Sequence, residues 1–155
     1  MKHKTFSISK RYNIDSDTLF EIVSDFENYY QWNTIIPDAK GKLVVNGELA
    51  LILKLNNKEK PLKPTVLSMD DKKSFLLSKI IIAKRIGELT HKFDFISLPN
   101  NTTQFTQTWT GKGILMQILW SKIERGFSDF NVFNNDLERF VEKRFANKGN
   151  RCTNL

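Results

Sequence analysis

The sequence is poor in the residues that build disulfides, metal sites and flexible turns. Its 155 residues include one Cys, two His, seven Gly and four Pro. Cys152 alone cannot form an internal disulfide, and two His with one distant Cys do not supply enough ligands for a zinc site. We therefore expect no metal ion and no other cofactor.

Motifs of covalent catalysis are missing as well. The chain has no GxSxG nucleophile elbow, no Gly-rich phosphate loop and no cysteine with an activating neighbour. The two glycines of GKGIL, at 111–115, fall between a predicted strand and a predicted helix, where a bend explains them better than an anion site. Acid-base chemistry by His91 with Glu88 stays open, but Glu88 falls at a predicted strand end. We rank catalysis below binding.

Long hydrophobic runs are also missing. No stretch approaches the roughly 18 apolar residues of a membrane span, and the N-terminal MKHKTFSISKRY lacks the apolar block of a signal peptide. The chain is 40% hydrophobic and 26% charged, which is typical of a globular domain. We expect a cytoplasmic protein with one domain over residues 1–146 and a flexible tail over 147–155.

The chain is basic, with a net charge of +7 from 24 basic and 17 acidic residues. Modest basic clusters lie at 58–63 and 139–151, and no strip of interleaved aromatic and basic residues of the single-strand-binding kind is present. A solvated basic surface explains this pattern best. No DNA partner is expected, while contact with RNA or a ribosome stays open as an alternative.

Apolar periodicity predicts a strand, two short helical segments and then a series of strands. Alternation predicts a strand over 5–12, and helical spacing after the cap-competent residues 15–18 predicts a helix of about ten residues, followed by a short turn through 27–32. Between 39 and 112, strands are predicted at 42–45, 48–55, 64–69, 74–82, 88–98 and 102–110. Asn46-Gly47 is the strongest hairpin signal, and 56–64 reads as a polar loop. The short links favour antiparallel pairing.

The last hairpin has a predicted register. If PNN at 99–101 is a tight turn, three residue pairs face each other on the inner side of the sheet: His91 with Trp109, Phe93 with Gln107, and Phe95 with Phe105. The polar outer face would carry Gln104, Thr106, Thr108 and Thr110.

The final third predicts one long helix over about 115–145, with an apolar stripe and a kink near Gly126. Together these elements predict the α+β class. A curved antiparallel sheet of six to seven strands would wrap around the long C-terminal helix, and two short helices would follow the first strand.

Four segments, in this order and spacing, resemble the START-like (SRPBCC) superfamily, which has the helix-grip fold of the polyketide cyclase, lipid-transfer and plant pathogenesis-related proteins. The segments are DFENYYQWNTIIP, IGELTHKFDFISL, TQFTQTWTGKGIL and FNNDLERFVE. The resemblance extends to about Phe145. Two positions depart from the family pattern: Tyr30 stands where a Pro commonly follows the Tyr of the short-helix motif, and Trp109 stands where the last strand often carries a carboxylate.

The resemblance implies an internal cavity that binds a small hydrophobic or amphipathic ligand, lipid-like or polyketide-like. The residues expected to line it are Trp32, His91, Phe93, Phe95, Phe105, Gln107, Trp109, Phe127 and Phe130. His91 and Gln107 would bond to each other or to backbone, or orient a ligand, and Gln107→Leu is expected to weaken ligand binding while the fold tolerates it. A cyclase or hydratase using the same cavity, and an interaction protein of the ribosome-associating or coenzyme-Q-related branch, stay open as alternatives.

The stretch around Trp32 has two interpretations. Its rings either plug the end of the core or form the rim of the cavity, where amphipathic side chains cover apolar surface and keep a polar edge in water. The sequence does not separate the two.

Overall fold

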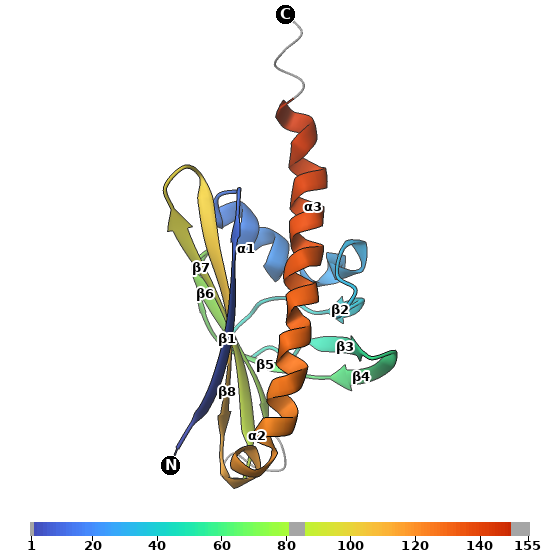
Figure 1. Cartoon of the computed structure of the whole chain (residues 1–155), viewed down its shortest axis with the longest axis vertical. Helices are drawn as coiled ribbons and strands as arrows, with labels where there is room; N and C mark the ends of the chain where they lie inside the picture. The colour runs from blue at the N-terminus through green and yellow to red at the C-terminus, as the bar shows by residue number, and fades with distance from the viewer. Residues whose placement is uncertain (1, 81–85, 150–155) are drawn as a thin grey trace, which may run out of the picture.

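The structure is a computed structural model, and it describes residues 2–80 and 86–149 (Figure 1). Within these residues, helical segments flank a set of antiparallel strands. The elements are β1 (Lys4–Tyr12), α1 (Ser16–Ser24), η1 (Phe26–Gln31), β2 (Asp38–Lys40), β3 (Ala50–Leu55), β4 (Lys58–Leu62), β5 (Thr65–Asp70), β6 (Ser74–Ile80), β7 (Glu88–Leu98), β8 (Thr102–Lys112), α2 (Ile114–Phe127), η2 (Ser128–Phe130) and α3 (Asn131–Gly149).

The described strands form two antiparallel sheets. Five strands pair in the order β1-β8-β7-β6-β5, and three shorter strands pair in the order β2-β3-β4. The α+β class is confirmed, and the described part of the chain has eight strands in place of the six or seven expected in one sheet. The long helical segment runs lengthwise beside the larger sheet (Figure 1).

The predicted register of the last hairpin is confirmed. His91 faces Trp109, Phe93 faces Gln107, and Phe95 faces Phe105. The turn works because Asn100 and Asn101 both adopt positive φ, at 63° and 56°. Burial alternates along the whole of β8, so one face of this strand packs inward and the other carries threonines.

Two predictions on the smaller sheet are wrong. Residues 42–45 do not form a strand, because the Asn46-Gly47 turn closes on Val44 through the Gly47 N–H at 2.8 Å and β3 pairs with Asp38–Lys40 instead. The segment 56–64, expected to be a loop, contains β4, which follows a turn with Asn56 and Asn57 at positive φ. Residues 81 and 82 of the strand expected at 74–82 lie outside the described residues.

The long C-terminal helix is confirmed, and it carries an irregular turn close to the kink expected near Gly126. Within it, α2 ends at Phe127, η2 makes one tight turn, and α3 continues to Gly149. The helix therefore extends three residues into the segment expected to be a flexible tail, and residues 150–155, with Cys152, lie outside the described part.

The two glycines before α2 form the expected bend. Gly113 has a φ of +95°, and a Cβ there would lie 2.5 Å from the Ile86 carbonyl oxygen. A Cβ on Gly111 would lie 2.7 Å from the Trp120 ring. Both positions need glycine, one for its backbone conformation and the other for a close approach, and so they direct α2 back along the sheet.

Aromatic rings fill the space between the larger sheet and the helices. Phe133 of α3 lies 6.2 Å from Phe105 and 6.5 Å from Phe93 between ring centroids, and Phe20 of α1 lies 5.1 Å from Phe95. These contacts fix α1 and α3 on the inner face of the sheet. They also decide how much interior space is left.

Candidate functional site

A cavity of about 130 Å³, partly open to solvent, lies between the two sheets and the start of the long helical segment. Its walls come from β3, β4, β6, β7, β8, α2 and η2, and they are mostly aliphatic or aromatic. The lining residues are Ile36, Leu51, Leu53, Leu62, Pro64, Leu77, Ser78, Lys79, Leu89, His91, Trp109, Phe127 and Phe130.

His91 places a titratable imidazole in this wall. Its ring stacks on Trp109 at 4.2 Å and lies 4.0 Å from Phe93, with Phe130 edge-on at 5.6 Å. Burial among these rings lowers the pKa of His91 to about 3, although its hydrogen bond to Gln107 acts in the opposite direction. The imidazole is therefore uncharged at neutral pH and presents a polar but neutral group to the cavity.

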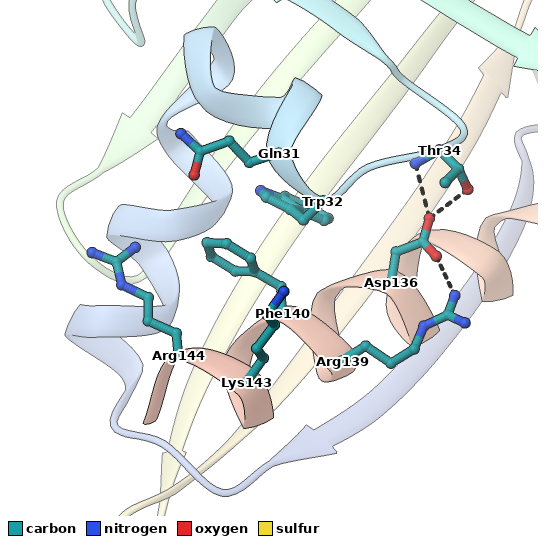
Figure 2. Close-up of a pocket in the computed structure, with 8 residues that line it drawn as sticks. All are labelled: Gln31, Trp32, Thr34, Asp136, Arg139, Phe140, Lys143 and Arg144. Carbon is teal, nitrogen blue, oxygen red and sulfur yellow. Dashed lines mark hydrogen bonds and ion pairs between the residues drawn. The ribbon is translucent and has the colours of Figure 1, made fainter. Parts of the chain in front are cut away.

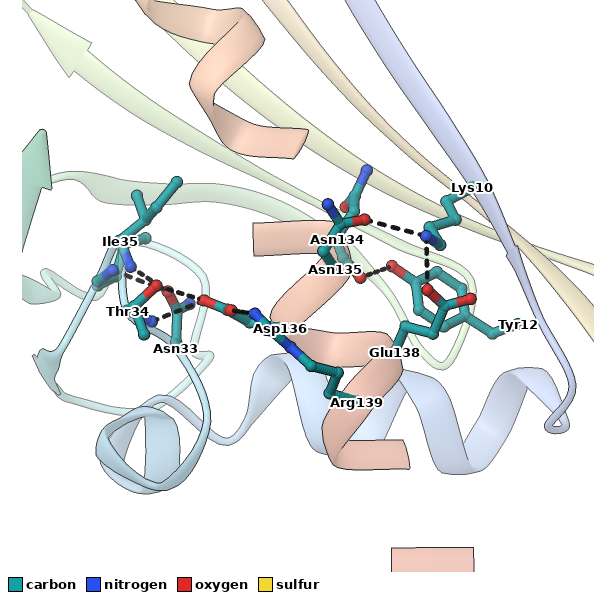
Figure 3. A network of polar contacts seen from close by, with 11 residues as sticks. Lys10, Tyr12, Asn33, Thr34, Ile35, Asn134, Asn135, Asp136, Glu138 and Arg139 are labelled. Atoms are coloured by element: carbon teal, nitrogen blue, oxygen red, sulfur yellow. Dashed lines mark hydrogen bonds and ion pairs between the residues drawn. The ribbon is translucent and has the colours of Figure 1, made fainter. Parts of the chain in front are cut away.

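A chain of hydrogen bonds connects His91 to the long helix. His91 Nε2 lies 3.0 Å from Gln107 Oε1, and Gln107 Nε2 donates to Asn134 Oδ1 at 2.9 Å. The Asn134 carbonyl oxygen in turn accepts from the Tyr12 hydroxyl at 2.9 Å (Figure 3). Gln107 is fully buried, and both ends of its amide have protein partners.

A second set of polar contacts fastens the segment after η1 to α3. Asp136 Oδ2 accepts from the Thr34 backbone N–H at 2.9 Å and from the Thr34 hydroxyl at 2.6 Å, while Asp136 Oδ1 accepts from Arg139 at 2.5 Å (Figure 3). Asn33 Oδ1 accepts from the N–H groups of Ile35 and Ile36 at 3.1 and 2.8 Å. The chain that carries Trp32 is thus held against α3.

Comparison with solved structures places this architecture among known ones. The chain matches a START superfamily protein from Mycobacterium smegmatis with a TM-score of 0.71 and 17% identity, over 92% of this chain and 99% of that one. It matches the Zhui aromatase/cyclase from Streptomyces sp. R1128 at 0.68 and 12%, over 92% and 96%. It matches a Thalictrum norcoclaurine synthase at 0.71 and 8%, over 92% and 96%.

This chain has the START-like helix-grip fold. The resemblance of the sequence to the SRPBCC superfamily is therefore confirmed at the level of the fold. No protein-family model and no curated protein sequence matches the chain.

The helix-grip fold brings some of the predicted site residues together and separates others. His91, Trp109, Phe127 and Phe130 line the cavity. Phe93, Phe95, Phe105 and Gln107 lie behind that wall in the packed core. The role of all nine in ligand binding stays a prediction.

Trp32 lies elsewhere. It packs on Tyr29 at 4.9 Å and on Phe133 at 5.1 Å, and its remaining exposed edge lines a groove on the outer surface, between η1 and α3 (Figure 2). It therefore plugs this end of the core, as one of the two interpretations proposed, and does not line the cavity between the sheets.

The small sheet of the helix-grip fold supplies the wall that the sequence did not predict. Leu51, Leu53 and Leu62 close the cavity from β3 and β4. The alternation of β3 was a usable signal for the first two. Leu62 was missed because β4, with the sequence KEKPL, carries three charged residues and a proline and reads as a loop.

His91 and Glu88, which the sequence suggested as an acid-base pair, form no hydrogen bond or ion pair with each other among the contacts of the described residues. The Glu88 carboxylate accepts from the Ser78 hydroxyl at 2.9 Å, and Glu88 is not among the residues that line the cavity. Within residues 2–80 and 86–149, no three His, Cys, Asp or Glu side chains are grouped so that they could hold a metal ion. No helix in the part of the chain that the structure describes has the length and apolar character to cross a bilayer.

Proposed function

We propose that this chain binds a small, mostly apolar ligand in the cavity between its two sheets, with His91 as the polar contact. The observation that carries the proposal is an apolar cavity of about 130 Å³ with an uncharged imidazole in its wall. Ligand pockets typically combine apolar walls with a few polar groups that fix orientation. Had the interior been solidly packed, the interaction-protein alternative would have been favoured.

The size of the cavity limits the ligand. Pockets for drug-sized molecules measure about 300–1,000 Å³, whereas an apolar cavity of about 150 Å³ holds a single benzene ring. The cavity of about 130 Å³ is therefore matched to one ring, or to the end of a longer apolar molecule. A lipid-like or polyketide-like ligand would enter with one end only, unless the small sheet moves outward.

The chemistry of the wall favours binding over catalysis. A general acid works best with a pKa near the operating pH, and burial lowers the pKa of His91 to about 3. Two structural neighbours are enzymes by name, an aromatase/cyclase and norcoclaurine synthase. Among the described residues, no carboxylate forms an ion pair with His91 that would raise its pKa toward neutrality, and Glu88 is bonded to Ser78.

Calorimetric titration with phenol and with toluene tests the proposal. Phenol is expected to bind with a Kd on the order of 1 mM, in keeping with its small number of atoms. Leu62→Trp on β4 adds an indole to the cavity wall and should abolish binding. Leu67→Trp makes the same change at an exposed position of β5 and should leave binding unchanged.

A third variant tests the polar contact. His91→Phe keeps a ring but removes the imidazole nitrogens, so phenol should lose its advantage over toluene, an advantage of about tenfold if one buried hydrogen bond is formed. Equal binding of phenol by the Leu62→Trp and Leu67→Trp variants, or no saturation by either ligand, would contradict the proposal.

A further inference from the structure

A groove of about 730 Å³ lies on the outer surface between η1 and the C-terminal half of α3 (Figure 2). Gln31 and Trp32 form one side, and Phe140, Lys143 and Arg144 form the other. An adjoining hollow of about 390 Å³ shares Gln31, Trp32, Phe140 and Arg144 with it. No described residue lines both this groove and the cavity between the sheets, so the two are separate features.

The floor of the groove is aromatic. The rings of Trp32 and Phe140 stack with centroids 6.2 Å apart and planes inclined by 29°. Phe140 is half-buried and leaves part of its ring on the surface. Among the described residues, none accepts a hydrogen bond from the Trp32 indole N–H. That nitrogen is not buried, so it is accessible from solvent. Figure 2 shows this nitrogen on the side of Gln31, where a bound molecule could accept from it.

The wall of the groove on α3 is cationic. Lys143 and Arg144 are exposed, and no carboxylate in the described part of the chain forms an ion pair with either. The Arg144 guanidinium carbon lies 5.7 Å from the centre of the Phe140 ring and 5.8 Å from that of Phe145, so this cation contacts the aromatic floor and a second ring beside it. The nearby Asp136 carboxylate is already occupied by Thr34 and Arg139, so it does not neutralise Lys143 or Arg144.

The dimensions of the groove favour a small molecule. From Asp136 to Arg144 the helix rises by about 12 Å, the length of a molecule with a few rings or a short chain. A stable protein partner would cover roughly 800 Å² on this side, which is far more than two turns of one helix provide. The volume of about 730 Å³ falls within the common range for small-molecule sites, about 300–1,000 Å³.

We propose that this groove binds a small organic anion that has an aromatic body and a phosphate or carboxylate group. The aromatic body would lie against Phe140 and the exposed edge of Trp32. The anionic group would be held by the planar fork of donors of Arg144, which suits oxyanions, and Lys143 on the other side of the Phe140 ring would add positive charge (Figure 2). The proposal does not depend on the ligand of the internal cavity.

Three related probes separate the contributions of charge and ring. Naphthyl phosphate and naphthoate carry the two candidate anionic groups on the same ring system, and naphthol carries neither. Both anions, or one of them, should bind at least about tenfold more tightly than naphthol, the gain expected from one charge-assisted contact. Preference for one anion identifies the group that the site recognises. Equal affinity for all three probes contradicts the proposal.

Two double variants with the same net charge locate the site. Lys143→Gln with Arg144→Gln removes both cations of the groove, and Lys58→Gln with Lys60→Gln removes two lysines of β4 as the matched control. The first pair should weaken naphthyl phosphate binding by at least about tenfold, and the second by less than about twofold. Thermal unfolding of each variant shows whether the fold is retained.

Equal weakening by both double variants would mean that the anion responds only to the overall positive charge, and it would overturn the proposal. Absence of calorimetric saturation by either anion up to about 10 mM would overturn it as well. Cavity variants provide an independent check, because Leu62→Trp should leave naphthyl phosphate binding unchanged whether or not the cavity binds phenol.

Discussion

Gln107→Leu tests the polar chain that joins the cavity wall to the long helix. The substitution nearly preserves volume, and from the sequence it was expected to weaken ligand binding while the fold tolerated it. The structure changes that expectation, because Gln107 is fully buried and bridges His91 and Asn134. The loss is now expected in the stability of the fold.

The magnitude follows from the two groups that lose a partner. Asn134 is buried, and its Oδ1 would lose the donor at 2.9 Å, which costs about 1–3 kcal/mol for an unsatisfied group. His91 Nε2 would lose its partner at 3.0 Å, at a cost near the lower limit of that range, about 1 kcal/mol, because this side chain is only half-buried. The sum is about 2–4 kcal/mol, a large part of the 5–15 kcal/mol that stabilises a typical domain.

Urea unfolding followed by tryptophan fluorescence measures this loss, with the unfolding midpoint expected to fall by roughly 1–2 M. Thr108→Val is the matched control on the same strand. Its hydroxyl lies 3.0 Å from that of Ser7 on the exposed face, and its removal should cost less than about 0.5 kcal/mol. A Gln107→Leu variant as stable as Thr108→Val would refute the view that this chain of hydrogen bonds holds β8 to α3.

Two further predictions concern His91 and the glycines of α2. Because the pKa of His91 falls from 6.5 in the unfolded chain to about 3 in the fold, only the unfolded chain gains a proton as the pH drops below 6.5, so stability should fall by about 1.4 kcal/mol per pH unit. Between pH 6.5 and 5 the free energy of unfolding should therefore fall by about 2 kcal/mol in the original protein and should not show this loss in a His91→Phe variant. If the stability of both proteins depends on pH in the same way, the prediction is wrong. Gly126→Ala should increase the free energy of unfolding by about 0.5–1 kcal/mol and so raise the melting temperature, because no heavy atom lies within 4 Å of the added Cβ. Gly113→Ala should lower it, because φ is +95° and the Cβ would lie 2.5 Å from the Ile86 carbonyl oxygen; equal melting temperatures for the two variants would contradict the steric argument.

Local patterns were sufficient to predict the strands of the larger sheet and the register of its last hairpin. Alternation along β7 and β8, together with a turn built from Asn100 and Asn101, sets a register that places three residue pairs on the inner face. The hairpin register is determined by about twenty neighbouring residues. Because side chains alternate between the two faces of a strand, only one register buries the aromatic rings. The smaller sheet was predicted poorly, since β4 is polar and its pairing with β3 depends on tertiary contacts.

The sites depend on contacts between distant segments, which one sequence does not reveal. Gln107 was placed correctly on the inner face, but its partner Asn134 lies 27 residues away on another element. The basic cluster beginning at Arg139 was visible, and so were the rings around Trp32. Only the folded chain shows that Thr34 and Asp136 hold these two segments together and so form a groove.

The scarcity of glycine has a consequence for the unfolded chain. Within residues 2–80 and 86–149, six residues other than glycine adopt positive φ, and five of them are asparagines: Asn46, Asn56, Asn57, Asn100 and Asn101. A glycine at these turns would avoid the steric cost of the left-handed conformation but would leave the unfolded backbone with more freedom to lose. In the unfolded chain an asparagine has fewer backbone conformations than a glycine. Formation of the β3-β4 and β7-β8 hairpins therefore loses less backbone entropy with asparagine turns than it would with glycine turns.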